Sequence, residues 1–192
     1  MEAEIHPASA AQPVVLVLAS GRGLRFAASG GTVHKLRAPL GGTTVLEHTL
    51  AAVRASGLPW HVEDVGHPGM GDSIAAAVHA TAGAAGWLVL PGDLPLIRPE
   101  TLRTIAAALA DPHCAVAMPV YRGERGHPVG FAAQCLQGLL ALTGEQGAAR
   151  LVRAQAQQGR VRWLDVEDEG AVTDIDTMTD LERAALLLAA RS

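Results

Sequence analysis

The sequence predicts an α/β protein in which a mostly parallel sheet is covered by helices on both faces, as a single three-layer α/β/α domain. Apolar runs at 14–18 and 87–90 show no alternation with polar residues, which is typical of strands buried on both faces. Stretches with helical spacing lie between the strand-like runs. A chain of 192 residues is long enough to bury one core, and it shows no internal repeat.

The individual elements follow from local patterns and from their end signals. We expect strands over residues 14–18, 60–65, 87–90, 115–121, 129–132 and 161–166. We expect helices over residues 44–56, 71–82, 99–110, 136–142 and 148–157, and a final helix capped within 179–182. Thr44 and Glu47 form a capping-box pattern, Asp72 or Ser73 is the expected cap of the second helix, and Pro99 is placed to begin the third.

The composition and charge of the chain exclude several classes of protein. The net charge of −4, from 15 basic and 19 acidic residues, argues against a general nucleic-acid surface. Cys114 and Cys135 fit neither a zinc-ligand spacing nor a disulfide framework, so we expect free thiols in a reducing cytoplasm. No apolar stretch has the length of a membrane span, and the start does not resemble a secretory signal. We therefore expect a cytoplasmic protein without membrane or nucleic-acid partners, with a flexible segment 1–12 before a domain over 13–192.

A glycine-rich, arginine-bearing loop follows the first strand directly, as Leu18-Ala19-Ser20-Gly21-Arg22-Gly23-Leu24-Arg25. Glycines let backbone N–H groups approach an anion closely, and arginine adds positive charge, so the loop is suited to phosphates. The same pattern also fits a plain structural turn. It lacks the third glycine of the dinucleotide fingerprint, and the chain has no Gly-Lys-Ser/Thr of a P-loop.

Carboxylates at two distant places are candidates for a metal site. Asp93 follows the buried strand 87–90, where a carboxylate is well placed to hold Mg2+ against substrate phosphates; it could equally cap a turn. Asp174 and Asp176 would share one face of an extended segment, and one of them could complete the site. Alternatively, both prepare the N-terminus of the following helix.

Three further residues are candidates for ligand contacts. Lys35 could reach phosphates as a mobile charge, or be an ordinary surface lysine. His127 could contact an anionic or polar substrate, or be structural. Ser73 lies near a helix N-terminus whose free N–H groups could meet a ligand, although capping explains it equally well. Because ligands of such sheets bind beyond the carboxyl ends of the strands, we expect the loops that start at Ser20, Gly92 and Arg122 to lie on one side of the molecule.

Read in order, these motifs resemble the MobA-like nucleotidyltransferases, and most closely the molybdenum cofactor cytidylyltransferases. The resemblance runs from Pro13 to about Ala189. It rests on the glycine-rich loop, Lys35-Leu36, Pro39-Leu40-Gly41-Gly42, Gly69-Met70-Gly71-Asp72-Ser73, Pro91-Gly92-Asp93-Leu94-Pro95, Gly126-His127-Pro128 and Asp174-Ile175-Asp176-Thr177. It implies a Rossmann-like fold of the nucleotide-diphospho-sugar transferase type.

The resemblance also implies a reaction and a set of roles. A nucleoside monophosphate would pass from CTP, or another NTP, to a molybdopterin-type phosphate, with release of pyrophosphate and with Mg2+ as cofactor. Arg25, Lys35 and Asp93 would be catalytic, Asp93 and Asp176 would bind the metal, and His127 would contact the acceptor. The nucleotide would be held by Leu18, Ala19, Ser20, Gly21, Arg22, Gly23, Lys35, Ser73 and Gly92. A molybdoenzyme or its chaperone would be a further partner.

The chain departs from the family pattern between Gly57 and Gly69. The family places a strand, a helix and another strand in this interval, whereas only one strand fits into 58–68. We therefore expect one α/β unit to be shortened there. Two other functions stay open: transfer to a sugar phosphate or another small phosphate acceptor, and a non-catalytic protein that binds nucleotide or cofactor.

Overall fold

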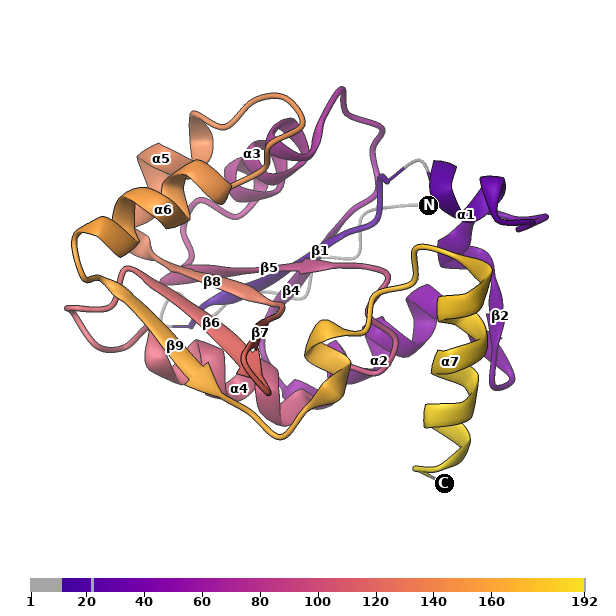
Figure 1. Ribbon diagram of the computed structural model, residues 1–192. Helices are drawn as coiled ribbons and strands as arrows, with labels where there is room; N and C mark the ends of the chain where they lie inside the picture. Colours follow the sequence, from indigo (N-terminus) through magenta and orange to yellow (C-terminus); the bar gives the residue numbers. More distant parts are fainter. Residues whose placement is uncertain (1–11, 22, 192) are drawn as a thin grey trace.

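The computed structural model describes residues 12–21 and 23–191 and shows a seven-stranded sheet between two layers of helices (Figure 1). Along the main path the strand order is β4-β1-β5-β8-β6-β7, and β9 pairs with β6. The strands that share one direction are β1 (Val14–Leu18), β4 (Trp60–Glu63), β5 (Gly86–Pro91), β6 (Val116–Tyr121) and β9 (Val161–Asp165). Strands β8 (Val129–Ala132) and β7 (Glu124–Arg125) run the opposite way. The predicted α/β class and mostly parallel sheet are confirmed.

The helices form the outer layers. On one face lie α3 (Met70–Ala80), α5 (Leu136–Leu140) and α6 (Ala149–Gln157), and on the other lie α2 (Val45–Ser56) and α4 (Pro99–Ala108) (Figure 1). At one end of the sheet, α1 (Leu24–Ala28), the hairpin of β2 (Pro39–Leu40) and β3 (Thr43–Thr44), and α7 (Met178–Ala189) stand together. Short 3-10 turns are η1 (Lys35–Arg37), η2 (Ala133–Cys135) and η3 (Glu169–Val172).

Strand β1 shows why the sheet needs a helix layer on each face. Val15 and Val17 pack into the apolar cluster shared with α2 and α4, whereas Val14 and Leu16 pack into the cluster shared with α3. Successive side chains of a strand point to opposite faces, so an unbroken apolar run requires cover on both sides. This is the layering that the sequence predicted.

A third apolar cluster joins the beginning and the end of the chain. Phe26 of α1 and Leu36 of η1 are buried with Ile175 and with Ala184 of α7. This packing holds the C-terminal segment beside the loop that follows β1. Cys114 and Cys135 are free and buried, as expected.

Two predicted helix caps are wrong. Helix α3 begins at Met70 after Gly69, without a side-chain cap, because Asp72 accepts the N–H of Gly144 and the Ser73 hydroxyl donates to the Gly69 carbonyl. Helix α7 is capped by Thr177 rather than within 179–182: Thr177 accepts the N–H of Asp180, whose carboxylate accepts the N–H of Thr177. Helix α3 thus begins one residue before the predicted start at residue 71, and the cap of α7 lies two residues before residue 179.

The interval between Gly57 and Gly69 contains one strand, β4, as predicted from its length. Strand β4 forms the edge of the sheet and pairs only with β1 among the described strands, so a shortened unit there leaves the inner strands intact. Of the expected flexible segment 1–12, residues 1–11 lie outside the described residues. Among the described helices, none is long and apolar enough to cross a membrane.

Candidate functional site

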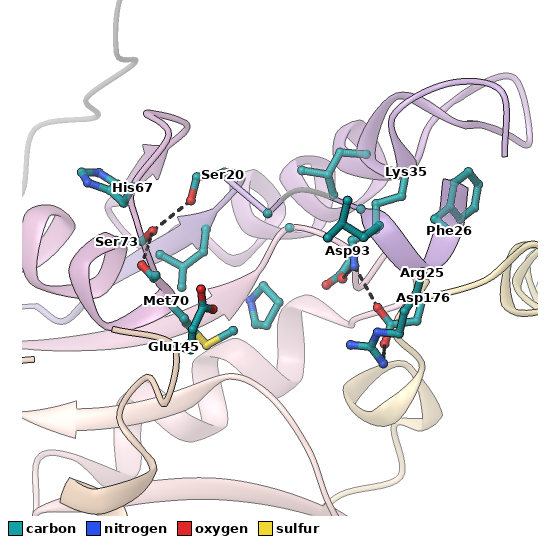
Figure 2. Close-up of a pocket in the computed structure, with 18 of the residues that line it drawn as sticks. Ser20, Arg25, Phe26, Lys35, His67, Met70, Ser73, Asp93, Glu145 and Asp176 are labelled. Atoms are coloured by element: carbon teal, nitrogen blue, oxygen red, sulfur yellow. Dashed lines mark hydrogen bonds and ion pairs between the residues drawn. The ribbon is translucent and has the colours of Figure 1, made fainter. Parts of the chain in front are cut away.

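A cavity of about 480 Å³ opens where β1 and β5 end (Figure 2). Both strands belong to the parallel part of the sheet, where ligand crevices form beyond the carboxyl ends. The lining residues come from six separate parts of the chain: Leu18, Ser20, Gly21, Gly23, Leu24, Arg25, Phe26, Lys35, Leu36, His67, Pro68, Gly69, Met70, Ser73, Pro91, Gly92, Asp93, Glu145 and Asp176.

The glycine-rich loop forms one wall of this cavity. Gly23 has φ 62° and directly precedes α1, so the backbone enters the helix from the left-handed region that favours glycine. The Gly21 carbonyl accepts a hydrogen bond from His34 Nε2 at 2.6 Å, which ties the loop to η1. Ala19 does not line the cavity, because its N–H donates to the Glu63 carbonyl and its side chain packs into the third apolar cluster. Arg22 lies outside the described residues.

Three carboxylates meet beside the loop. One oxygen from each of Asp93, Asp174 and Asp176 lies within 4.8 Å of the others. Asp93 follows β5, whereas the other two come from the segment between η3 and α7, held in place by the buried Ile175. The sequence predicted Asp93 and Asp176 as partners, and the structure adds Asp174, which is more exposed.

Lys35, the only lysine of the sequence, lies between two of these carboxylates. Its Nζ donates to Asp93 Oδ2 at 2.5 Å and to Asp176 Oδ1 at 3.0 Å (Figure 2). Burial alone would lower the pKa of Lys35, but the charges and hydrogen bonds of Asp93 and Asp176 outweigh it and raise the pKa. The lysine is therefore a fixed cation within the cavity.

Arg25 supplies a second cation to the same group. Its Nη1 lies 2.5 Å from Asp176 Oδ2, while the arginine side chain is 79% exposed. Such a side chain can leave its partner at small cost, since exposed ion pairs are weak. Arg25 can therefore swing toward a ligand, whereas Lys35 is held more firmly.

The remaining carboxylate atoms leave room for a cation. Asp93 Oδ1 is buried and has no hydrogen-bond partner among the described residues. Burial, and after it the negative charge of Asp93, raises the pKa of Asp174. Crowded carboxylate oxygens are the donor set that hard divalent cations prefer.

The opposite end of the cavity carries different side chains. The hydroxyls of Ser20 and Ser73 lie 3.0 Å apart, and His67, Met70 and Glu145 stand near them (Figure 2). His67, Met70 and Glu145 were not identified as site residues from the sequence. Glu145 reaches the cavity because the Gly144 carbonyl accepts the N–H of Gly71, a contact between distant loops that no local pattern signals.

His127 is absent from the residues that line the cavity. Its backbone N–H donates to the Ala171 carbonyl at 2.8 Å, and its ring Nδ1 is buried without a partner among the described residues. Burial lowers the pKa of His127, against an opposing effect of the Asp93 carboxylate. The ring is thus held neutral beside the acidic group, and its role toward an acceptor stays a prediction.

The sequence model of the MobA-like NTP transferase domain matches residues 50–161, which is more than half of the chain. The chain belongs to the MobA-like NTP transferase family. The match includes Asp93, Ser73 and His127, whereas the glycine-rich loop, Lys35 and Asp176 lie outside the matched residues.

Among curated proteins, this MobA-like chain is 36% identical over 146 residues to a 2-C-methyl-D-erythritol 4-phosphate cytidylyltransferase of Cereibacter sphaeroides. The match covers 60% of the chain and 64% of that enzyme, so the chain spans less than two thirds of the relative's length. Purine catabolism protein PucB of Bacillus subtilis is 29% identical over 119 residues, covering 61% of the chain and 56% of that protein.

Solved structures share the fold over nearly the whole chain. Rv0371c from Mycobacterium tuberculosis H37Rv superposes with a TM-score of 0.73 and 27% identity, covering 91% of this chain and 98% of that one. Its complex with manganese superposes with a TM-score of 0.69, 26% identity and the same coverage. A nucleotidyl transferase from Methanothermobacter (Mth528) reaches a TM-score of 0.78 at 24% identity, covering 94% and 99%, and supports the fold alone.

Proposed function

We propose that this protein is a Mg2+-dependent nucleotidyltransferase that transfers a nucleoside monophosphate from CTP to a molybdopterin-type phosphate acceptor and releases pyrophosphate. The observation that carries the proposal is the meeting of three carboxylates with Lys35 and Arg25 at one end of a cavity walled by a glycine-rich loop. Membership of the MobA-like family and the cytidylyltransferase relative support it.

A divalent cation fits the carboxylate group. Asp93 and Asp176 would hold it, with Asp174 beside them, and the unpartnered Asp93 Oδ1 is a ready ligand atom. The manganese complex of the structurally similar Rv0371C supports a divalent ion at such a fold. When bound, the ion would neutralise charge on the phosphates and orient them.

The reaction requires little side-chain chemistry. An oxygen of the acceptor phosphate forms a bond to the α-phosphorus, and the bond from that phosphorus to the bridging oxygen breaks, so that pyrophosphate leaves with the electron pair. Arg25 would swing from Asp176 onto the phosphates, and Lys35 would offset their charge from its place beside Asp93 and Asp176. Backbone N–H groups around Gly21, Gly23 and Gly92 would hold the triphosphate, because positioning and charge neutralisation carry most of such a transfer.

The acceptor has a second candidate. The resemblance of the motifs favours a molybdopterin-type phosphate, whereas the 36% identical relative is a cytidylyltransferase named for 2-C-methyl-D-erythritol 4-phosphate, a small polyol phosphate. Both acceptors present a phosphate that attacks the same α-phosphorus, so the metal and nucleotide roles are common to the two proposals.

Pyrophosphate release separates these proposals. The protein would be incubated with Mg2+, each of CTP, GTP, ATP and UTP, and either a molybdopterin-type phosphate or 2-C-methyl-D-erythritol 4-phosphate. Release with CTP and the pterin supports the leading proposal, and release only with the polyol phosphate selects the alternative. The absence of release with every pair would refute nucleotidyl transfer to these acceptors.

Asp93→Ala tests the metal role. We expect activity to fall by about a hundredfold or more, because the buried carboxylate oxygen that would bind the ion is lost. Asp165→Ala, which removes an exposed carboxylate from the end of β9, is the matched control and should keep full activity. Unchanged turnover in the Asp93 variant, with a native circular dichroism spectrum, would refute the assignment.

A further inference from the structure

The end of the cavity that faces away from Asp93 contains a histidine held by a buried carboxylate. His67 Nε2 lies 3.1 Å from Oε1 of Glu63, and only 6% of the Glu63 residue is exposed. The Val65 N–H donates to the same oxygen at 3.3 Å. Glu63 thus anchors the His67 ring from the end of β4, within the interval where the chain departs from its family.

This contact determines which ring nitrogen carries the proton. A carboxylate has only lone pairs to offer, so Nε2 must donate, and the neutral ring then has an unprotonated Nδ1 that accepts a hydrogen bond. Nδ1 of His67 has no partner within the described part of the chain, and the residue lines the cavity. His67 therefore offers an acceptor atom without a donor among the residues that line the cavity.

The nucleoside is the part of an NTP that would reach this acceptor. The cations and carboxylates place the triphosphate at the Asp93 end, and the glycine-rich loop runs from there to Ser20 at the His67 end (Figure 2). The other side chains near His67 are Met70, which is 51% exposed and apolar, the carboxylate of Glu145, and the paired hydroxyls of Ser20 and Ser73. A flat base with an outward amino group matches an apolar surface bordered by acceptors.

We infer that His67 selects a base with an exocyclic amino group, cytosine rather than uracil, and that Glu63 is the positioning residue that keeps His67 in the accepting tautomer. This inference rests on the proposed function. Cytosine offers an amino group to Nδ1, whereas uracil offers a carbonyl whose lone pairs would face those of the ring. A site built to satisfy one hydrogen-bonding pattern discriminates against a ligand that leaves it unpaired.

Equilibrium binding tests the inference without any acceptor. The dissociation constants of CTP, UTP and 2′-deoxy-CTP would be measured with Mg2+ by calorimetry. Wild-type protein should bind CTP about tenfold more tightly than UTP. CTP gains one net hydrogen bond, whereas UTP leaves the acceptor of the site unpaired. Failure to bind any of these nucleotides refutes the proposed function, whereas binding CTP and UTP equally refutes only this inference.

Variants assign the effect to the Glu63–His67 pair. His67→Phe keeps a flat ring but has neither ring nitrogen, so the preference for CTP should fall to about twofold or less. Glu63→Gln can accept or donate, which frees the His67 tautomer, so the preference should also fall while CTP still binds. His79→Gln, which changes an exposed histidine of α3, should retain the wild-type preference.

Two outcomes would overturn the inference. An unchanged ratio of CTP to UTP affinity in His67→Phe shows that the ring does not read the base. Equal weakening of CTP and UTP, together with a lost preference for CTP over 2′-deoxy-CTP, assigns the hydrogen bond to the ribose instead. Circular dichroism and thermal unfolding of the Glu63 variant separate a change in recognition from a loss of structure.

Discussion

At the scale of single residues, Lys35 has two roles in one cavity. Its ammonium group lies between Asp93 and Asp176, where it balances charge, and it is close enough to the loop to serve a phosphate. Because the pKa of Lys35 is raised, the stability from this ion pair is full at neutral pH and is lost as the pH rises past the ordinary pKa of lysine. A cation that binds the carboxylates has to compete with this lysine.

Lys35→Met tests that competition. Without added metal we expect a loss of about 2–4 kcal/mol of unfolding free energy, because close carboxylates are left without their buried counter-charge. Added Mg2+ or Mn2+ should raise the thermal midpoint of the variant more than that of the wild-type protein. Arg37→Met, at an exposed neighbouring position, is the control. An equal response to metal in both variants would contradict this account.

At the scale of elements, α3 begins where two loops touch. A Cβ on Gly71 would lie 2.8 Å from the carbonyl carbon and oxygen of Thr143, and the Gly71 N–H donates to the Gly144 carbonyl at 2.7 Å. Only a residue without a side chain allows backbone segments to approach so closely. This contact also brings Glu145 into the cavity.

Gly71→Ala should therefore lower the unfolding free energy by about 1–3 kcal/mol, since the atoms in the way are backbone and have to shift. Urea denaturation measures the loss. Gly83→Ala is the matched control, because nothing lies within 4 Å of the Cβ it adds, and it should be nearly neutral. Equal stability of the two variants would show that the loops separate without cost.

Helix α7 provides a pH-dependent prediction. The Asp180 carboxylate accepts the N–H and the hydroxyl of Thr177, both at 2.7 Å. Burial alone would raise the pKa of Asp180, but these hydrogen bonds outweigh it and lower the pKa. The stabilisation is therefore present above the ordinary carboxyl pKa and is lost as the pH falls below it.

Asp180→Ala should cost about 1 kcal/mol at neutral pH, as loss of a cap does. The difference in unfolding free energy between this variant and the wild-type protein should shrink as the pH falls below the ordinary pKa of an aspartate, because the carboxyl group then becomes protonated. Denaturant titrations at several pH values give the comparison, with the exposed Glu182→Ala in the same helix as control. A difference that does not change with pH would contradict the charge-based explanation.

At the scale of the whole molecule, one buried carboxylate connects the C-terminal segment to the helical layer. Asp168 accepts the N–H of Arg98 at 2.9 Å, the hydroxyl of Thr101 at 2.6 Å and the N–H of Gly170 at 3.0 Å. This joins η3 to the start of α4, and the same segment continues to Asp174 and Asp176. The carboxylates proposed to bind the metal thus depend on an anchor outside the cavity.

Asp168→Ala should cost about 2–4 kcal/mol, because three donors in a buried place lose their acceptor. It should also reduce the thermal shift produced by Mg2+, since the segment that carries Asp176 is less firmly placed. Asp168→Asn keeps one acceptor oxygen and should show a smaller loss in both measurements. Equal thermal shifts in all three proteins would show that metal binding does not depend on Asp168.

Local patterns were enough to identify most elements and the ends of the central strands. The apolar run 14–18 and the glycine loop after it are neighbours in sequence, and so are β5 and Asp93, so their relation survives in any fold that buries these strands. Asp93, Lys35, Arg25 and Asp176 were predicted as site residues, and the structure brings all four together. The loops after β1 and β5 share one edge of the parallel sheet, which predicted that Arg25 and Asp93 would lie near each other, whereas the common site of all four residues was implied by the resemblance to the family.

Long-range packing decided the rest. Ala19 belongs to the predicted loop, yet the backbone bond to β4 and the third apolar cluster turn it away from the cavity. Glu145 enters because Gly71 meets Gly144, and His67 is fixed because β4 places Glu63 beneath it. Periodicity and end signals determine helices and strands, because these elements form through interactions between near neighbours in the sequence. Which side chains face a cavity depends instead on contacts between distant segments, and only the tertiary structure fixes those contacts.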